Sequence, residues 1–260
     1  MRSDRKIIEY KGQEYTNTDL INSLLRLGIC CGDTICMHTE LFKFGNPLLP
    51  KKEFLDSILE CFYEVIGQEG TLIMPTFTYS YCKNEIYNKN ESKTKMGALN
   101  EFFRRQKGVK RTDDPIFSFA LKGKKEKLFL KETTSCFGKN CVYDILLKEK
   151  GKYIVFGGVG HTLTHFAEEK NGITYRYHKN FSGILIDEFG IRKETSIDYY
   201  VRKLEEKSIP NLTKIIKTVS LIKSHKDIKY AGDFIHIYDA NEYVEAIINV
   251  IKKDKMALVQ

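Results

Sequence analysis

The sequence predicts an α/β fold in which a sheet is flanked by helices. Short apolar runs rich in β-forming residues occur at residues 34–38, 71–74 and 153–156. Between them lie segments whose apolar residues recur every three or four positions, the spacing of one helix face. Glycines separate the two kinds of segment. Strands that alternate in this way with helices are typical of an α/β core.

The first half of the chain supplies two helices around the first strand. The first helix is expected to begin with Thr18 as its N-cap and to end at Gly28. The second is expected to open at Pro50, because proline is favoured at a helix start. The strands predicted at residues 34–38 and 71–74 follow these two helices in turn.

The middle of the chain continues the alternation. Residues 98–105 and 142–148 have helical spacing, whereas residues 116–121 are expected to be extended. A third strand at residues 153–156 leads through a glycine turn into a helix that begins near Thr162.

The last third changes character. Residues 184–192 alternate around a central turn, which predicts a hairpin, and a second strand is expected near 197–200. Helices then close the chain, most clearly at 240–252. We expect one domain over residues 1–260, with insertions at about 79–95 and 184–200. The first insertion is polar, and we expect it to be mobile and to cover a substrate.

Composition narrows the function classes. The 42 Lys and Arg exceed the 34 Asp and Glu, so the chain of net charge +8 favours anionic partners. We do not expect nucleic acid as a partner, because no RNA- or DNA-binding signature accompanies the basic cluster at residues 104–111. A non-catalytic RNA-binding module is the alternative that this cluster leaves open. Seven cysteines without a paired CxxC argue against disulfides and structural zinc. Without a long apolar run, we expect a cytoplasmic protein that does not bind membranes.

The helix after the third strand carries the candidate catalytic residues. His165 shares a helix face with Thr162, Glu168 and Glu169. Histidine titrates near neutral pH, and a neighbouring carboxylate fixes its tautomer, so this helix predicts a proton-transfer site. The spacing of His161, His165 and Glu169 also permits a metal-dependent hydrolase. Thr162, however, stands where an H-E-x-x-H helix needs its glutamate.

Five segments in sequence order carry a family resemblance. They are residues 32–45, 70–78, 96–102 and 108–118, and the T-x-x-H-x-x-E pattern formed by Thr162, His165 and Glu168. Together they resemble the aminoglycoside 3-N-acetyltransferase family of acetyl-CoA-dependent enzymes. The resemblance implies a mixed central sheet flanked by helices, a C-terminal hairpin with helices, and acetyl-CoA as co-substrate without a metal.

The resemblance also implies roles for individual residues. His165 would be the general base, Glu168 would orient it, and Thr162 or backbone N–H groups near Thr76 would donate to the oxyanion. Thr39 is expected at a helix start, where phosphate binds well. The residues expected to bind coenzyme A are His38, Thr39, Thr76 and Arg111. A helix cap for Thr39, packing for His38 and surface charge for Arg111 are the alternatives.

The acceptor is expected to be an amino sugar. The basic net charge favours an anionic acceptor, which would be a nucleotide-linked deoxyamino sugar for surface polysaccharide. The alternative acceptors are the polycationic aminoglycosides. Asp114 stands where the family usually has histidine, and the segment at 160–162 is shorter than in the drug-modifying members. Both differences would change the side of the site that binds the acceptor. The expected substrate-binding residues are Thr78, Tyr79, Asp114, Arg176 and Lys179. A homodimer is compatible with this interpretation.

Overall fold

A seven-stranded mixed sheet forms the centre of the protein. The computed structural model describes residues 4–204 and 206–260. The strand order is β12-β13-β9-β3-β5-β8-β7. β9, β3 and β5 run parallel, and the outer strands pair antiparallel. The strands are β3 (Thr34–Thr39), β5 (Thr71–Pro75), β7 (Lys110–Arg111), β8 (Phe119–Gly123), β9 (Lys152–Phe156), β12 (Lys226–Tyr230) and β13 (Asp233–Asp239). The predicted mixed α/β fold is therefore confirmed.

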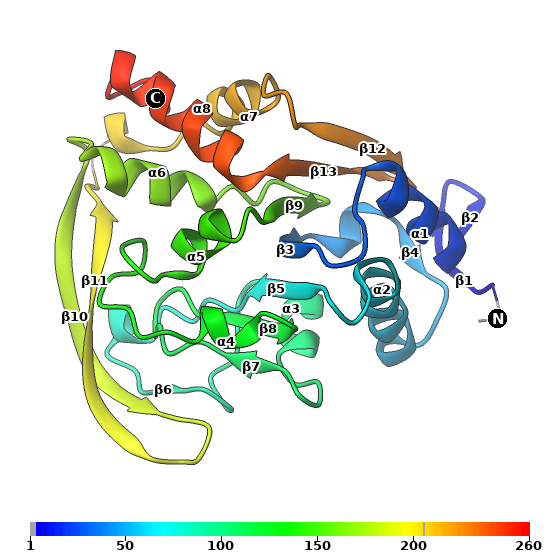
Figure 1. Cartoon of the computed structure of the whole chain (residues 1–260), viewed down its shortest axis with the longest axis horizontal. Helices are drawn as coiled ribbons and strands as arrows, with labels where there is room; N and C mark the ends of the chain where they lie inside the picture. Colours follow the sequence, from blue (N-terminus) through cyan, green and yellow to red (C-terminus); the bar gives the residue numbers. More distant parts are fainter. Residues whose placement is uncertain (1–3, 205) are drawn as a thin grey trace.

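Helices cover both faces of this sheet (Figure 1). Ile35 and Met37 of β3 pack in one apolar cluster with α1, α2 and α3, whereas Cys36 packs in a second cluster with α5, α6 and α8. Successive strand residues point to opposite faces, so a strand buried on both sides reads as one continuous apolar run. The helices are α1 (Asn17–Arg26), α2 (Lys51–Ile66), α3 (Ala98–Phe103), α4 (Glu126–Phe129), α5 (Val142–Lys148), α6 (Leu163–Asn171), α7 (Leu212–Val219) and α8 (Ala240–Lys253), with short 3₁₀ turns η1 (Leu41–Lys43), η2 (Tyr81–Lys83) and η3 (Glu206–Ser208).

The first helix begins earlier than predicted. Thr16, and not Thr18, is the N-cap of α1: its side chain accepts the N–H of Asp19, and the Asp19 carboxylate accepts the N–H of Thr16. This reciprocal capping box satisfies two backbone donors that a cap at Thr18 would leave open. Pro50 precedes α2 directly, as predicted.

The C-terminal hairpin is much longer than predicted. β10 (Arg176–Ile186) and β11 (Arg192–Arg202) pair antiparallel along their whole length, and β6 (Tyr87–Asn88) pairs parallel with the end of β10. Figure 1 shows the hairpin as a curved arm along one side of the molecule. The predicted turn is correct, because the Asp187 carboxylate accepts the N–H groups of Phe189 and Ile191. The strand expected at 197–200 is part of β11.

Two other pairs of strands were not predicted. β1 (Lys6–Tyr10) and β2 (Gln13–Thr16) form a small sheet with β4 (Asn46–Pro47). β12 and β13 occupy a region where only helices were expected, so that expectation is wrong for residues 226–239. β12 is an edge strand with an exposed lysine at its start, and such polar edge strands lack the apolar run that marks a buried strand.

The insertion at residues 79–95 is packed into the fold and is not the loose segment expected, whereas its role in covering a substrate stays a prediction. Tyr81 and Tyr87 are buried in the core. The main chain is also fixed, since the N–H of Lys89 donates to Ile186 and that of Lys95 donates to Phe77. The segment therefore serves as a support under the end of the hairpin.

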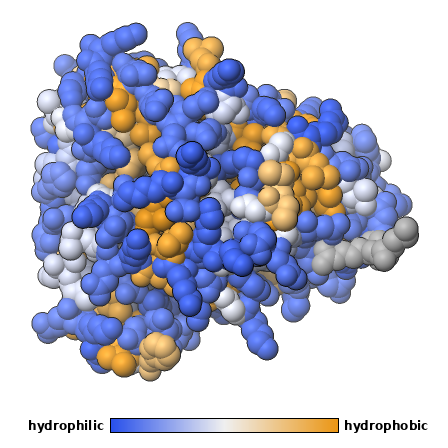
Figure 2. All heavy atoms as spheres, viewed as in Figure 1, coloured by the Kyte–Doolittle hydropathy of each residue, from blue (hydrophilic) through white to orange (hydrophobic). Residues whose placement is uncertain are grey.

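Within the described residues, no helix is long and apolar enough to cross a membrane. Figure 2 shows hydrophilic residues over most of one face, with hydrophobic groups between them. The cytoplasmic location and the single-domain organisation stay predictions.

Candidate active site

The ends of the central parallel strands bring the candidate residues together. β3, β5 and β9 are parallel, so their carboxyl ends lie at one edge of the sheet, where ligands bind in α/β folds. β3 ends in His38 and Thr39, and β9 is followed by the glycine turn at 157–160. This turn needs glycine, because a Cβ on Gly160 would lie 2.5 Å from the Cβ of His38. α6 starts three residues later, which sets His165 beside this edge.

His165, Glu168 and Arg176 form a cluster in which the charged Glu168 and Arg176 are buried and His165 is partly exposed. His165 Nδ1 lies 2.8 Å from Glu168 Oε2, as the i,i+3 spacing on α6 predicts. Arg176, the first residue of β10, places Nε 2.8 Å from the same oxygen and Nη2 2.8 Å from His165 Nδ1. The Nε–H does not point along the line to the oxygen, so this is an ion pair and not an aligned hydrogen bond. Tyr175 donates its hydroxyl to Glu168 Oε1 at 2.7 Å.

This cluster fixes the protonation state of the histidine ring. Two groups compete for Nδ1: ionised Glu168 can only accept a hydrogen bond from it, whereas Arg176 Nη2 can only donate to it. We assign the proton of the neutral ring to Nδ1, because Arg176 keeps the Glu168 carboxylate as its ionic partner in that state. Nε2 then carries the free lone pair, and it has no hydrogen-bond partner within the described residues. Burial and the charge of Arg176 lower the pKa of His165, against the opposing effect of Glu168. The ring is therefore neutral near pH 7 and able to accept a proton.

Glu168 is ionised despite its burial, since its side chain is only 2% exposed. Burial favours the neutral acid, but His165, Arg176 and Tyr175 together outweigh it and hold the pKa of Glu168 below its ordinary value. The carboxylate can therefore offset the charge of a protonated His165.

Thr162 does not contact the catalytic ring through its hydroxyl. Its Oγ1 lies 3.1 Å from Nε2 of His38 and hydrogen-bonds the Tyr143 hydroxyl. The same Tyr143 hydroxyl lies 3.3 Å from Nε2 of His38. Burial, together with nearby His161, lowers the pKa of His38 to about 3, so the ring is neutral. Thr162, His38 and Tyr143 form a neutral hydrogen-bonding triangle, and Thr162 precedes His165 by one helical turn.

A cavity of about 500 Å³ opens at the strand ends beside this triangle. His38 and Thr39 from β3, Gly157 and Gly160 from the glycine turn, and Lys95 line it. Thr39 is the last residue of β3 and is followed by a three-residue 3₁₀ turn, so the expected anion site at a helix start is absent there. Its hydroxyl donates to Asn100 Oδ1 at 2.7 Å. We call this space the strand-end cavity.

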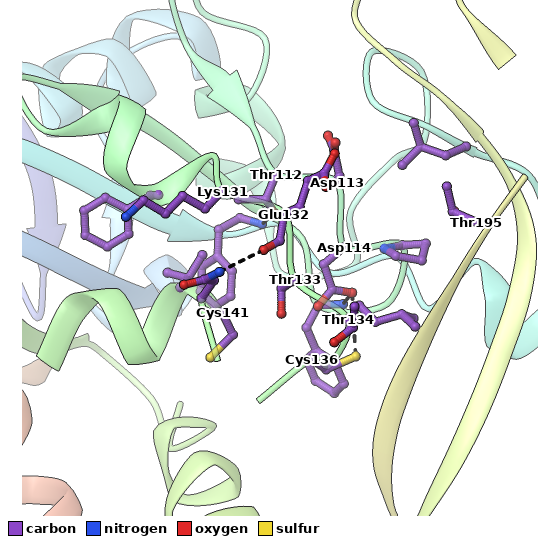
Figure 3. Close-up of a pocket in the computed structure, with 18 of the residues that line it drawn as sticks. Thr112, Asp113, Asp114, Lys131, Glu132, Thr133, Thr134, Cys136, Cys141 and Thr195 are labelled. Carbon is purple, nitrogen blue, oxygen red and sulfur yellow. Dashed lines mark hydrogen bonds between the residues drawn. The ribbon is translucent and has the colours of Figure 1, made fainter. Parts of the chain in front are cut away.

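A second cavity of about 260 Å³ lies between the hairpin and the loop before α5 (Figure 3). Asp114, Cys136 and Thr195 line it. Phe117 forms part of its wall and lies 4.7 Å from Phe137 between ring centroids, and Phe137 in turn lies 5.7 Å from the ring of His165. Two aromatic rings in series, Phe117 and Phe137, therefore link the wall of this hairpin cavity to the catalytic ring.

Three predicted binding residues have structural roles. Thr76 uses its N–H and its hydroxyl on Ser118, so it offers no oxyanion donor. Arg111 is buried and donates to Thr76, to the Lys89 carbonyl and to the Ser92 carbonyl, which leaves it unavailable for a phosphate. Thr78 donates to the Pro115 carbonyl and is buried. These internal hydrogen bonds weigh against a role in binding cofactor or acceptor, and the three assignments stay predictions.

The remaining acceptor candidates separate into different places. Arg176 belongs to the cluster with His165 and Glu168, where its guanidinium also donates to the Tyr200 carbonyl. Lys179 is exposed on β10 beside the Phe181 ring. Tyr79 packs edge-on against Phe117, at a φ of 56°. Lys179 and Tyr79 remain predictions as acceptor contacts.

The alternative metal site does not form. His161 Nδ1 lies 3.0 Å from the Tyr243 hydroxyl, whereas Glu169 accepts from Ser135 at 2.9 Å. His165 faces Glu168. Among the described residues, no group of three or more His, Cys, Asp and Glu side chains is arranged to hold a metal ion.

Sequence reasoning missed one member of the triangle and one neighbour of Glu168. Tyr143 reaches His38 and Thr162 from α5, and Tyr175 reaches Glu168 from the loop before β10. Both contacts join separate elements, so no local pattern reveals them.

Comparisons with known proteins identify relatives of this chain. The family model described as aminoglycoside 3-N-acetyltransferase matches residues 37–252. A curated relative, the SPbeta prophage-derived aminoglycoside N(3′)-acetyltransferase-like protein YokD of Bacillus subtilis, is 24% identical over 156 residues. That match covers 52% of this chain and 56% of YokD, so it spans about half of the relative's length.

Solved structures share the fold over most of the chain. AAC-VIa bound to sisomicin superimposes with a TM-score of 0.79 at 19% identity, covering 92% of this chain and 98% of that one. AAC-IIIb in a binary complex with CoASH gives a TM-score of 0.78 at 18% identity, covering 92% and 97%. The structure of YokD gives 0.75 at 19% identity, covering 92% and 93%. At these identities the likeness shows the fold.

Proposed function

Because the chain belongs to the aminoglycoside 3-N-acetyltransferase family, we propose that it transfers the acetyl group of acetyl-CoA to an amine of an aminoglycoside-type amino sugar. The observation that carries the proposal is the neutral imidazole of His165, oriented by buried Glu168 and leaving Nε2 without a partner. Such a ring is a general base for an amine. The acyltransferase activity follows from the family. What we propose beyond it is the class of acceptor.

His165 handles the proton of the reaction. Nε2 accepts the proton of the attacking amine as the new N–C bond to the thioester carbonyl forms. Glu168 stabilises the resulting imidazolium through Nδ1–H. When the C–S bond breaks, the imidazolium returns the proton to the sulfur of coenzyme A, and the ring is neutral again. A positioned base of this kind typically contributes about 10²–10⁴ in rate.

The strand-end cavity is the better place for the thioester. It is the larger of the two cavities and lies at the carboxyl ends of the parallel strands, the usual ligand position in this fold class. Thr162 contacts His38, which lines this cavity, and precedes His165 by one helical turn. Its hydroxyl would donate to the carbonyl oxygen in place of His38, with Tyr143 as its remaining partner. Lys95 supplies a cation near the cavity for phosphate.

The acceptor evidence favours a cationic amino sugar. Arg176, expected on the acceptor side, and Arg111, expected at coenzyme A, are both bound within the protein. The hairpin cavity carries the carboxylates of Asp113, Asp114 and Glu132. A related structure, AAC-VIa, contains sisomicin. A nucleotide-linked amino sugar is the second candidate, because the net charge of +8 attracts anions.

A direct acceptor comparison tests the proposal. Purified protein is incubated with acetyl-CoA and, separately, sisomicin, gentamicin or a nucleotide-linked amino sugar, and thiol release and product mass are followed. We expect acetylated sisomicin or gentamicin, at a rate well above thioester hydrolysis. Acetylation of the nucleotide sugar alone would favour the second candidate, and no acetylated amine from any acceptor would contradict the proposed function.

A further inference from the structure

The hairpin cavity contains a carboxylate that the acetyl-transfer chemistry does not use. We propose that Asp114 anchors a second ammonium group of the acceptor while a different amine reacts at His165, so that the preferred acceptors carry at least two amines. This inference rests on the proposed function and specifies its acceptor. It is carried by the hydrogen bonds of Asp114, the charges of the cavity and the position of the aromatic wall.

The two oxygens of Asp114 have different environments. Oδ1 accepts the backbone N–H of Ile116 at 2.8 Å and that of Phe117 at 2.7 Å, and the Cys136 thiol approaches it at 3.7 Å. Oδ2 has no hydrogen-bond partner in the described part of the chain. The residue is 6% exposed and lines the cavity, where Figure 3 shows it beside Thr134 and Cys136. A nearly buried carboxylate is thus held rigid by one oxygen and leaves the other for a ligand.

Burial makes this carboxylate responsive to a cation. Removal from water raises the pKa of Asp114 to about 6, against the lowering effect of the two backbone N–H groups. A buried carboxylate without a counter-charge gains more from an ammonium ion than an exposed one, because the surrounding medium screens the pair less. The environment of Asp114 therefore suits a cation better than a neutral hydroxyl.

The neighbouring charges are consistent with an ammonium ligand. Glu132 adds an exposed carboxylate to the same cavity. The cation of Lys193 is engaged by Asp187 at 3.3 Å, and that of Lys89 by Asp113 at 2.7 Å. Lys131 also lines the cavity, where it is exposed. Among the described residues no ion pair joins any of these three lysines to Asp114, so its carboxylate charge stays available.

The aromatic wall separates the anchored amine from the reacting one. Phe117 lines the hairpin cavity and packs at 4.7 Å on Phe137, which packs at 5.7 Å on the ring of His165, so the cavity and the catalytic ring are neighbours two aromatic rings apart. An amine at Asp114 is therefore too far to be deprotonated by His165. The cavity volume of about 260 Å³ lies below the range of about 300–1,000 Å³ typical of drug-sized ligands, which suits one sugar ring of a larger acceptor.

The test uses Asp114→Asn, which keeps the Oδ1 acceptor for both backbone N–H groups and removes the charge. The readout is the ratio of kcat/KM for sisomicin, which has several amines, to kcat/KM for glucosamine, which has one. We expect this ratio to fall about tenfold to a hundredfold, since hydrogen bonds to charged groups are worth that much in affinity. The matched control is Asp254→Asn, an exposed aspartate that also accepts a backbone N–H, and we expect an unchanged ratio.

Binding separates this inference from the proposed function. Calorimetry of sisomicin with the protein alone needs no turnover, and we expect Asp114→Asn to weaken binding by the same factor. If the wild-type protein acetylates no amine but Asp114→Asn still weakens sisomicin binding, the proposed function fails and the anchor stands. An unchanged ratio and unchanged binding in a folded Asp114→Asn variant would overturn the anchor, as would an equal loss with both acceptors.

Discussion

Replacing Glu168 by glutamine tests how the catalytic ring is held. Glu168 contacts His165 Nδ1 at 2.8 Å, Arg176 Nε at 2.8 Å and the Tyr175 hydroxyl at 2.7 Å, with 2% of its side chain exposed. Glutamine has nearly the same shape and keeps an oxygen for Tyr175. It removes the negative charge that stabilises the protonated ring and that compensates Arg176.

The size of the effect follows from these contacts. A hydrogen bond to a charged group is worth about 1.5–3 kcal/mol. At about 4 Å, two unit charges attract by about 4 kcal/mol at an effective dielectric constant of about 20, an upper bound here because Arg176 already repels the protonated ring. A loss of about 3–4 kcal/mol in the transition state corresponds to a fall in kcat of about 10²–10³. Breaking the buried pair with Arg176 also destabilises the fold, by about 3–5 kcal/mol.

The assay must separate these two losses. Thiol release at saturating acetyl-CoA and acceptor gives kcat at a temperature well below the unfolding transition, which is measured by circular dichroism. The matched control is Glu169→Gln, the next residue of α6, whose carboxylate accepts from Ser135 and not from His165. We expect the control to stay within a few fold of wild type. A folded Glu168→Gln protein with wild-type kcat would refute the role of the carboxylate.

Two further changes probe the same edge of the sheet. Arg176→Met removes a cation that helps to lower the pKa of His165, so we expect the acid limb of the kcat/KM profile to move to higher pH. An unmoved limb would show that Arg176 does not act on the ring. Gly160→Ala places a Cβ 2.5 Å from the Cβ of His38, so we expect the free energy of unfolding to fall by about 1–3 kcal/mol and the KM for acetyl-CoA to rise. Chemical denaturation and thiol release measure the two effects. Wild-type values for both would contradict the tight turn.

Local patterns predicted the parts of the fold that local physics determines. β3, β5 and β9 are buried on both faces, so their apolar runs stand out in the sequence. The His165 and Glu168 contact follows from helix geometry alone, because residues three apart share a face.

Other parts depend on tertiary context and were not predictable in this way. β10 begins at Arg176 and runs through exposed polar residues, so only its pairing with β11 makes it a strand. Arg111 belongs to a strongly basic segment, yet its guanidinium is satisfied by backbone carbonyls of a distant loop. Charge in a sequence shows which residues attract anions, but not which of them the fold has already paired.

The general-base role of His165 is tested most directly by His165→Ala and His165→Gln in the thiol-release assay with an accepted amine. We predict that both folded variants lose about 10²–10⁴ in kcat, because neither side chain accepts the amine proton at neutral pH. Turnover close to wild type in both variants would contradict the assignment and with it the proposed chemistry.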